Sequence, residues 1–406
     1  MASPSIRGGD RHAVPRSPIQ CISFHKFHKF MSESKAQRRR GGGAGILLLA
    51  ISLITLMSIA LVIFATGEPA LQKTPTDIRT PMGVLGDSDS HAYHDRILLP
   101  GAKRRGGSFR PTTLQWTEVV EMLRTDQIDQ GTWGRWGTPY HKMAVLRSLV
   151  GQEGRAPQKE DFRYNFSVSG SECSALTERP SIQAQRLLYL MRQDIERWSR
   201  GVVVIRIGIN SIGKDEDLDR YASTGLDVAA RARLKDCIAY FSSAKALIRA
   251  EHPRTAILLA SNADDNPPLQ QDRWPDAQSR ARISTVFDEF DFQLRQLCES
   301  DARCVYHSDR RWFRELFGAE DVQGHRAYRS IAFGGEVQVT NTVGDHPRNA
   351  TTQDEHPGTA LNALYAQRLL QLLNAELGFH FRAITQLELA RVVDPDARFG
   401  LRAEKP

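Results

Sequence analysis

The sequence predicts an α/β protein in which helices cover both faces of a parallel β-sheet, giving a three-layer α/β/α arrangement. Short apolar segments alternate with longer segments of helical periodicity along most of the chain. The clearest strand, 202–207, reads Val-Val-Val-Ile-Arg-Ile and is an almost continuous β-branched run. Such a run is typical of a parallel strand buried on both faces, and strands that alternate with helices are typical of this architecture.

The other elements follow the same alternation within one predicted domain, residues 80–380. The predicted strands are 82–85, 162–168, 202–207, 255–260 and 303–307. The predicted helices are 113–123, 182–198, 226–250, 281–298 and 359–377. Residues 381–406 are charged and lack a clear period, so we expect a C-terminal tail with little regular structure. In a sheet of this kind, a functional site lies beyond the carboxyl ends of the strands.

The net charge of +7 is confined to the N-terminal part of the chain. Residues 1–43 contain nine Lys or Arg and two Asp or Glu, whereas the remaining residues contain equal numbers of basic and acidic side chains. A nucleic-acid-binding domain concentrates positive charge on its folded surface. The sequence therefore gives no reason to expect nucleic acid as a partner.

The uncharged run 44–66 follows this basic segment directly. As a helix that rises about 1.5 Å per residue, it is long enough to cross the hydrocarbon core of a membrane, about 30 Å thick. We expect a single-pass transmembrane signal anchor, with residues 1–43 in the cytoplasm and, after a linker at 67–79, the domain on the extracytoplasmic (periplasmic or extracellular) side. A cleaved signal peptide is the alternative. Met31 is an alternative start to Met1.

Four of the five cysteines lie beyond the uncharged run. An even number of cysteines in an exported domain permits two disulfides. Cys298 and Cys304 are close in sequence and form the favoured pair, Cys173 and Cys237 form the second pair, and a fully reduced state is the alternative. No spacing resembles a zinc site, so we expect neither a metal nor another cofactor.

Four positions at the ends of predicted elements combine into a candidate catalytic site. Ser88 follows the first predicted strand, Gly170 the second and Asn210 the third, while His356 immediately precedes the last helix. A serine hydroxyl becomes a nucleophile when a base removes its proton, and the reaction needs donors for the developing oxyanion. The histidine supplies such a base, and a glycine amide and an asparagine side chain supply such donors.

In this order, the four motifs resemble the four sequence blocks of the SGNH hydrolases, also called the GDSL esterase/lipase superfamily. The resemblance covers about residues 80–377. It implies a flavodoxin-like fold with a parallel sheet. It also implies that Ser88 is the nucleophile and His356 the general base. Gly170, Asn210 and the backbone amide of Ser88 would form the oxyanion hole.

The last motif departs from the family pattern, in which an aspartate stands three residues before the histidine. Gln353 occupies that position, Asp354 lies one residue closer to the histidine and Asp345 lies farther away. Either carboxylate would orient the imidazole as the acid of a triad does, and a backbone carbonyl is the third alternative. We favour Asp354.

Several aromatic and histidine side chains near these motifs are expected to be structural. Trp133, Trp136 and Tyr140 lie in a glycine-rich segment and are expected to pack as a local apolar lid; stacking on a sugar ring is the alternative. His91 and His94 follow the nucleophile motif and are expected to be surface or capping residues.

The function that these inferences predict is that of a membrane-anchored serine esterase. It would hydrolyse an acyl ester, acetyl esters included, through a Ser-His acyl-enzyme mechanism, and carbohydrate is one class of substrate. One alternative is an O-acyltransferase that acts on cell-envelope polysaccharide. The other is a non-catalytic glycan-binding protein that keeps the fold. A binding protein has no need of all four motifs, which favours an enzyme.

Overall fold

The computed structural model describes residues 42–65, 77–100, 112–149, 151–261, 273–318, 329–333 and 337–396. The chain divides into two compact units, Met1–Thr66 and Gly67–Pro406.

The described part of the first unit is helix α2, Gly42–Ala65. It coincides with the uncharged run 44–66, and the side chains of residues 47–58 are exposed. No helix within the described ranges is both long enough and apolar enough to span a membrane. The transmembrane role of residues 44–66 therefore stays a prediction.

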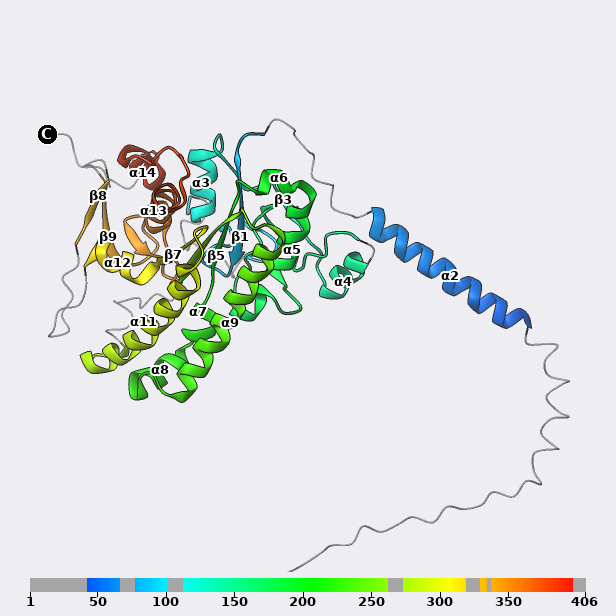
Figure 1. The fold of residues 1–406 in the computed structure, drawn as a ribbon, viewed down its shortest axis with the longest axis horizontal. Helices are drawn as coiled ribbons and strands as arrows, with labels where there is room; N and C mark the ends of the chain where they lie inside the picture. The colour runs from blue at the N-terminus through cyan, green and yellow to red at the C-terminus, as the bar shows by residue number, and fades with distance from the viewer. Residues whose placement is uncertain are drawn as a thin grey trace, which may run out of the picture. The chain divides into compact units, whose positions relative to one another are not determined.

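The centre of the second unit is a parallel sheet (Figure 1). Its strands follow the order β2-β1-β5-β6-β7. Its strands are Thr80–Gly86 (β1), Ile128–Asp129 (β2), Val202–Arg206 (β5), Ala256–Ser261 (β6) and Cys304–Ser308 (β7). Counted along the chain, this is the doubly wound order 2-1-3-4-5, in which the direction of winding reverses between β1 and β5. The predicted parallel sheet is confirmed, and the reversal marks the place where such sheets hold their ligands.

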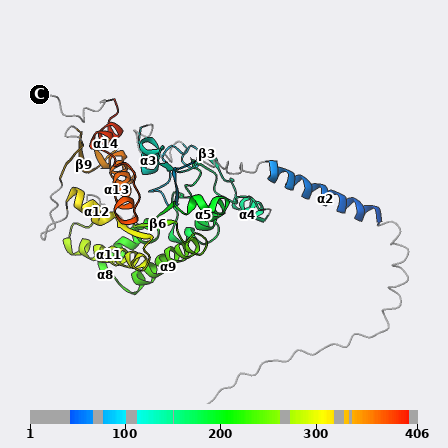
Figure 2. The same cartoon turned by 45° about the horizontal axis from the view of Figure 1, so that its top comes forward.

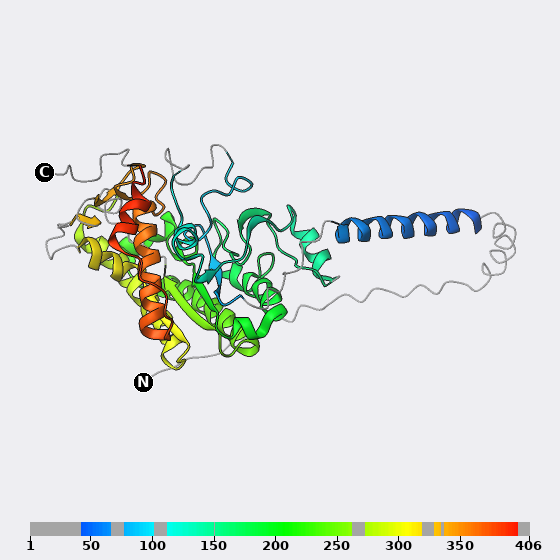
Figure 3. The same ribbon diagram turned by 90° about the horizontal axis from the view of Figure 1, so that it is seen from above.

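Alternate side chains of the strands pack into two apolar layers on opposite faces of the sheet. Val84 and Val204 belong to one layer, whereas Leu85, Val203 and Ile205 belong to the other. Helices α3 (Trp116–Arg124), α12 (Asp309–Phe317), α13 (Thr359–Leu377) and α14 (Gln386–Val393) cover the first face. Helices α5 (Gln183–Met191), α9 (Val228–Glu251) and α11 (Ala277–Glu299) cover the second (Figure 3). These are the three layers that the sequence predicts.

The second predicted strand, 162–168, differs from the structure. Strand β4, Lys159–Phe162, pairs instead with β3, Trp133–Trp136, in a separate antiparallel sheet. The chain then returns alongside β1, where Val84 bonds to Tyr164 and Phe166, while β2 pairs with the start of β1. The edge beside β1 is therefore built from two pieces of chain, which no single apolar run reveals.

The predicted helix 182–198 is interrupted. It consists of α5, a 3-10 turn at Arg192–Asp194 and the short helix α6, Ile195–Trp198. The sequence did not predict α4 (His141–Leu149), α7 (Ile209–Ile212), α8 (Asp215–Thr224), α12 or α14. The short helices α6 and α7 contribute few residues to any periodic pattern, so they leave a weak signal in the sequence.

A small second sheet precedes the last long helix. It contains β8 (Ile331–Phe333), β9 (Val337–Val343) and β10 (Asn349–Thr351), in the order β10-β9-β8. Phe333, Val337 and Val339 add to the apolar layer that α13 covers. This sheet leads the chain directly to His356.

The predicted tail 381–406 is wrong for its first part, because residues 386–393 form α14. Helices α3, α13 and α14 lie side by side (Figure 2). Leu389, Val392 and Val393 belong to the apolar layer. Arg124 of α3 donates two hydrogen bonds to Glu388, at 2.8 and 3.0 Å. A capping box at Thr385 begins the helix.

Both expected cysteine pairs are disulfides in the structure. Cys173 pairs with Cys237 on α9, and Cys298 at the end of α11 pairs with Cys304 at the start of β7. The first of these bridges holds the segment that follows Gly170 against α9.

Candidate active site

Ser88 lies on the turn that follows β1, at the carboxyl edge of the sheet, and is buried. The strand ends at Gly86, where an added Cβ atom would lie 2.5 Å from the main-chain oxygen of Arg206 in β5. Only glycine lets the two strands approach this closely. The Gly-Asp-Ser motif therefore begins with a residue that packing requires, and the serine emerges at the point where the sheet order reverses.

The side chain of Asp87 joins the turns that follow β1 and β5. It is fully buried, accepts a hydrogen bond from the amide of Asp89 at 3.0 Å and one from the amide of Gly208 at 3.3 Å. A buried carboxylate that accepts backbone amides holds both loops in a fixed geometry. The aspartate of the motif therefore positions Ser88 relative to the turn that carries Asn210.

Buried side chains also donate to three successive carbonyl oxygens of the Ser88 turn. Gln115 donates to the oxygen of Ser88 at 3.2 Å, Arg206 to that of Asp89 at 2.6 Å and Asn165 to that of Ser90 at 2.7 Å. Because each of these carbonyls has a buried donor, the turn is held in one conformation.

Arg206 and Asp309 form a buried ion pair at the cavity wall. Nε and Nη2 of Arg206 both donate to Oδ2 of Asp309, at 2.8 and 2.6 Å, and the guanidinium lies 4.2 Å from the centre of the Tyr365 ring. Burial raises the pKa of Asp309 to about 7, against the opposing effect of Arg206. The pair fixes the arginine that holds the Asp89 carbonyl.

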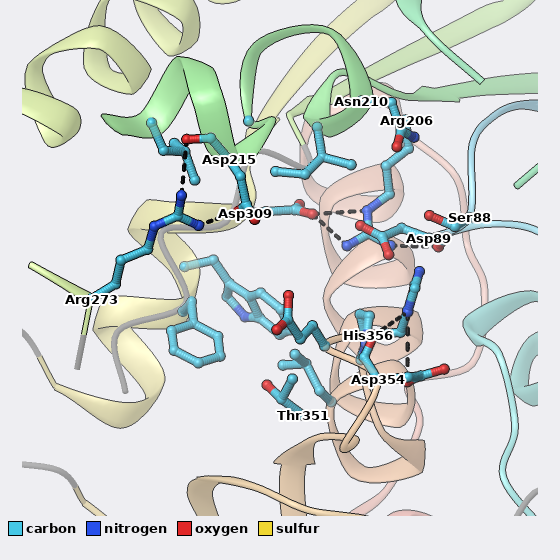
Figure 4. A pocket seen from close by; sticks show the side chains of 18 of the residues that line it. Ser88, Asp89, Arg206, Asn210, Asp215, Arg273, Asp309, Thr351, Asp354 and His356 are labelled. Atoms are coloured by element: carbon cyan, nitrogen blue, oxygen red, sulfur yellow. Dashed lines mark hydrogen bonds and ion pairs between the residues drawn. The ribbon is translucent and has the colours of Figure 1, made fainter. Parts of the chain in front are cut away.

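His356 lies in a tight loop between β10 and α13. The amide of Thr352 donates to the main-chain oxygen of His356 at 2.8 Å, and the amide of Glu355 donates to the oxygen of Thr352 at 3.0 Å. Glu355 has a φ of 67°, a left-handed conformation that is uncommon outside glycine. The loop therefore folds back on itself and turns the imidazole toward the Ser88 turn (Figure 4).

The imidazole of His356 is oriented by a main-chain oxygen. Its Nδ1 atom lies 2.8 Å from the main-chain oxygen of Asp354 and 3.6 Å from Oδ1 of the same residue. Oδ1 of Asp354 accepts a hydrogen bond from the hydroxyl of Thr352, and Asp345 accepts one from the amide of Gln353. Of the three acceptors expected from the sequence, the carbonyl is the one at hydrogen-bond distance from Nδ1.

This contact determines the tautomer of the neutral ring. A carbonyl oxygen only accepts, so the Nδ1 atom of His356 must carry the proton. The Nε2 atom then has the lone pair that a general base requires. The arrangement gives His356 the chemical form that its predicted role needs.

Asn210 lies on α7, immediately after β5. One of its two amide protons is donated to the main-chain oxygen of Ser171, at 3.1 Å. This bond fixes the side chain at the cavity that Ser88 and His356 also line. An amide nitrogen has two protons, so an asparagine fixed in this way can still donate to a substrate oxygen.

Gly170 lies in the same loop as Ser171, but it is exposed and is not among the described residues that line the Ser88 cavity. It borders a neighbouring depression together with Ser169 and Ser171. Its φ of 78° explains why a glycine stands there. The structure thus brings Ser88, Asn210, Asp354 and His356 together and places Gly170 beside them.

The cavity has a volume of about 440 Å³. Three aromatic residues that the sequence did not single out, Trp274, Trp312 and Phe313, contribute to its lining. Arg273 and Asp215 form an ion pair on the side opposite Ser88 (Figure 4). These residues come from α8, α12 and the start of the segment before α11, so only the folded chain brings them together.

Trp133, Trp136 and Tyr140 lie elsewhere. Trp136 is buried in β3 and donates to the main-chain oxygen of Asp161, and Trp133 meets Phe162 edge to face. Tyr140 is exposed. None of the three is among the described residues that line the cavity.

The two histidines after Ser88 have structural partners. His91 is fully buried, so its expected surface position is wrong; its Nε2 atom lies 2.8 Å from Asp95. Nδ1 of His94 lies 2.6 Å from Glu118. In the part of the chain that the structure describes, no cluster of three His, Cys, Asp or Glu side chains could hold a metal ion.

Comparison with known proteins gives matches among solved structures alone. No family model and no curated protein matches the sequence. An acetylxylan esterase from Geobacillus stearothermophilus is 14% identical, with a TM-score of 0.35, and the match covers 75% of this chain and 98% of that chain. A carbohydrate esterase family 2 enzyme with a carbohydrate-binding domain, from Corynascus thermopiles (Myceliophthora fergusii), is 14% identical, with a TM-score of 0.30 and coverage of 77% and 68%. Both of these solved structures are of enzymes described as esterases.

Proposed function

We propose that this chain is a serine esterase whose nucleophile is Ser88 and whose general base is His356. The observation that carries the proposal is the contact between Nδ1 of His356 and the main-chain oxygen of Asp354, at a cavity that Ser88 also lines. That contact leaves the lone pair of the imidazole on Nε2, the atom that takes a proton from a serine in acyl transfer.

In the first half of the reaction, the Oγ atom of Ser88 forms a bond to the acyl carbon of the ester while its proton passes to Nε2 of His356. The tetrahedral intermediate collapses, the bond between the acyl carbon and the alkoxy oxygen breaks, and the alcohol leaves with the proton from His356. In the second half, His356 takes a proton from water, the resulting hydroxide attacks the acyl-enzyme, and Ser88 regains its proton as the acid departs.

The oxyanion of each intermediate is stabilised by the side chain of Asn210 and the backbone amide of Ser88. The bond from Asn210 to Ser171 fixes the direction of the first donor, and the donors that hold the Ser88 turn fix the second. Gly170 is the third proposed donor. Donors that are already in place cost no reorganisation when charge develops, which is where most of the rate enhancement arises.

We propose an acylated carbohydrate as the substrate, with an acetyl ester as the first candidate. Flat aromatic side chains beside polar groups are suited to a ring that carries hydroxyls, and the cavity offers Trp274 and Trp312 beside Asp215 and Arg273. The same acyl-enzyme would serve an O-acyltransferase if a glycan hydroxyl replaced water as the acceptor.

The test uses the purified full-length chain, a p-nitrophenyl acetate assay and a fluorophosphonate probe. We expect turnover and labelling in the parent and neither in Ser88→Ala, while Ser223→Ala, which changes an exposed serine on α8, keeps both. Labelling that persists in Ser88→Ala would remove this serine from the nucleophile role. Incubation with acetylated and free oligosaccharides then separates the activities, because an esterase releases free acid and a transferase forms a newly acylated glycan.

A parent chain without turnover or labelling, but with affinity for a glycan, would favour the non-catalytic alternative. The decisive variant for that case is Ser88→Ala/His356→Ala. Full glycan affinity in this variant would show that binding does not use the reactive groups.

We also propose that residues 44–66 anchor the protein in a membrane, with the domain outside the cytoplasm. The basic segment before an uncharged run supports this orientation. Two disulfides support an oxidising compartment. Protease treatment of intact spheroplasts that express the full chain tests the proposal: the domain should be degraded from outside, and a domain protected until lysis would contradict it.

A further inference from the structure

A second set of hydrogen-bonded side chains consists of Asp95, His91 and Ser169. Nε2 of His91 lies 2.8 Å from Oδ2 of Asp95, and Nδ1 of His91 lies 2.7 Å from the hydroxyl oxygen of Ser169. The side chains of His91 and Asp95 have no exposed surface. His91 belongs to the turn that carries Ser88, whereas Ser169 belongs to the loop that carries Gly170, so the three side chains join the two loops.

The direction of these hydrogen bonds follows from one main-chain contact. The amide of Ser169 lies 3.3 Å from Nδ1 of His91, and an amide nitrogen only donates. Nδ1 of His91 is therefore an acceptor, and Nε2 carries the proton that is donated to Asp95. The other carboxylate oxygen of Asp95 accepts the amides of Ile97 and Glu160, at 2.7 and 3.1 Å. Burial would raise the pKa of Asp95, but the bonds to His91 and to these amides outweigh it and lower the pKa.

The short loop 169–171 is held at both ends, and a residue of the proposed site holds one of them. His91 accepts the amide of Ser169 at one end, and Asn210 donates to the main-chain oxygen of Ser171 at the other. Gly170 lies between them. The position of the loop therefore determines where the Gly170 amide and the Asn210 side chain point.

We propose that His91 is a positioning residue for the oxyanion donors. Its Nδ1 atom fixes the Ser169 amide, and through the loop it sets the direction of the Asn210 side chain relative to Ser88. Asp95 contributes by holding the imidazole in the tautomer that accepts at Nδ1. This inference rests on the proposed function, because it assigns His91 a role in the reaction of Ser88.

Two substitutions separate the two ends of the imidazole. In His91→Asn, the side-chain oxygen reaches the place of Nδ1 and can accept the Ser169 amide, but the bond to Asp95 is lost. In His91→Gln, the side-chain nitrogen reaches the place of Nε2 and can donate to Asp95, but the acceptor for Ser169 is lost. Each variant loses one of the two hydrogen bonds of the buried imidazole, the one to Asp95 or the one to Ser169. If the role of His91 were purely structural, the two variants would lose similar stability and activity.

The proposal predicts different kinetics for the two variants. Because a displacement of about 1 Å at a catalytic group costs up to about 10² in rate, kcat of His91→Gln should fall between about tenfold and about a hundredfold with KM nearly unchanged. His91→Asn should keep kcat within about threefold of the parent, as rescue through the Ser169 contact requires. His380→Gln, which changes an exposed histidine, is the matched control. Equal kcat in the Asn and Gln variants would overturn the proposal.

Backbone hydrogen exchange of the full-length chain provides a readout that does not depend on turnover. The amides of residues 169–171 should exchange faster in His91→Gln than in His91→Asn. If the parent has no esterase activity but this difference is present, the proposed function fails while the positioning contact stands. If the parent is active and the exchange rates are equal, the positioning role alone fails. Fluorophosphonate labelling of Ser169 in Ser88→Ala would also overturn the proposal, since it would make Ser169 a nucleophile.

Discussion

The Nδ1 atom of His356 lies 2.8 Å from the main-chain oxygen of Asp354 and 3.6 Å from its carboxylate. Asp354, which is one position in sequence from the place where the family pattern has its aspartate, therefore contacts the imidazole mainly through its backbone. Since any residue supplies a carbonyl, the orientation of the base depends on the shape of the loop, and in particular on the left-handed conformation of Glu355.

Replacement of the Asp354 carboxylate should therefore leave most of the activity in place. In Asp354→Asn, the main-chain oxygen is kept, and the side-chain oxygen still accepts from Thr352. We expect kcat within about threefold of the parent, whereas a carboxylate that acted as the triad acid would cost about 10⁴. Steady-state kinetics with p-nitrophenyl acetate measure this, with His356→Ala as the inactive reference.

Removal of the Asn210 side chain should affect the transition state more than the bound substrate. For Asn210→Ala we expect a loss of about 10²–10³ in kcat with little change in KM, because the donor acts on charge that develops during the reaction. The control is the unfolding temperature, which must stay near that of the parent. A variant with unchanged kcat would exclude Asn210 from the oxyanion hole.

Removal of one partner of the buried Arg206–Asp309 pair should lower the stability of the protein more than replacement of both partners by apolar residues. Arg206→Met leaves a buried carboxylate without its partner and should lower the free energy of unfolding by about 3–5 kcal/mol. Arg206→Met/Asp309→Leu should recover part of this loss, because neither charge is then buried. Urea denaturation of the parent, both single variants and the double variant measures the coupling, and strictly additive effects would contradict it.

Acid should weaken the attachment of α14. The hydrogen bond from Arg124 lowers the pKa of Glu388 to about 2, below its ordinary value of 4.5. A carboxylate whose pKa is lowered in the folded state stabilises that state above its unfolded pKa, and the contribution is lost as the pH falls toward about 2. Glu388→Gln should therefore lower the unfolding temperature at pH 7 and make a smaller difference at pH 3. An equal difference at both values would contradict the role of this ion pair.

The central sheet could be predicted because its strands carry their own signal. The run from Val202 to Ile205 is buried along its whole length, and such a strand needs apolar residues at every position rather than at alternate ones. Strand β9 shows the opposite case. Its buried and exposed residues alternate, and with polar residues such as Thr340 and Asn341 it resembles a loop in sequence.

The candidate site also contains residues that the sequence predicts and contacts that it does not. Ser88, Asn210 and His356 could be predicted because each lies at a fixed place relative to a strand or helix end. The main-chain contact of Asp354 could not be, because it depends on the conformation of Glu355, and the buried position of His91 depends on Ser169, which is distant in sequence. Contacts of this kind form only in the folded chain, so no local sequence pattern predicts them.

The divided edge beside β1 has a consequence for protein engineering. The amide of Tyr164 donates to the main-chain oxygen of Gln130 at 2.9 Å, so the chain leaves the sheet and re-enters it at neighbouring points. The segment between these points leaves the sheet and returns to it, and within it Tyr140, just before α4, is exposed. A fluorescent reporter or an affinity tag inserted at this position would not change the distance between Gln130 and Tyr164, where the segment starts and ends. The position is therefore a suitable attachment point for following the protein in a living cell.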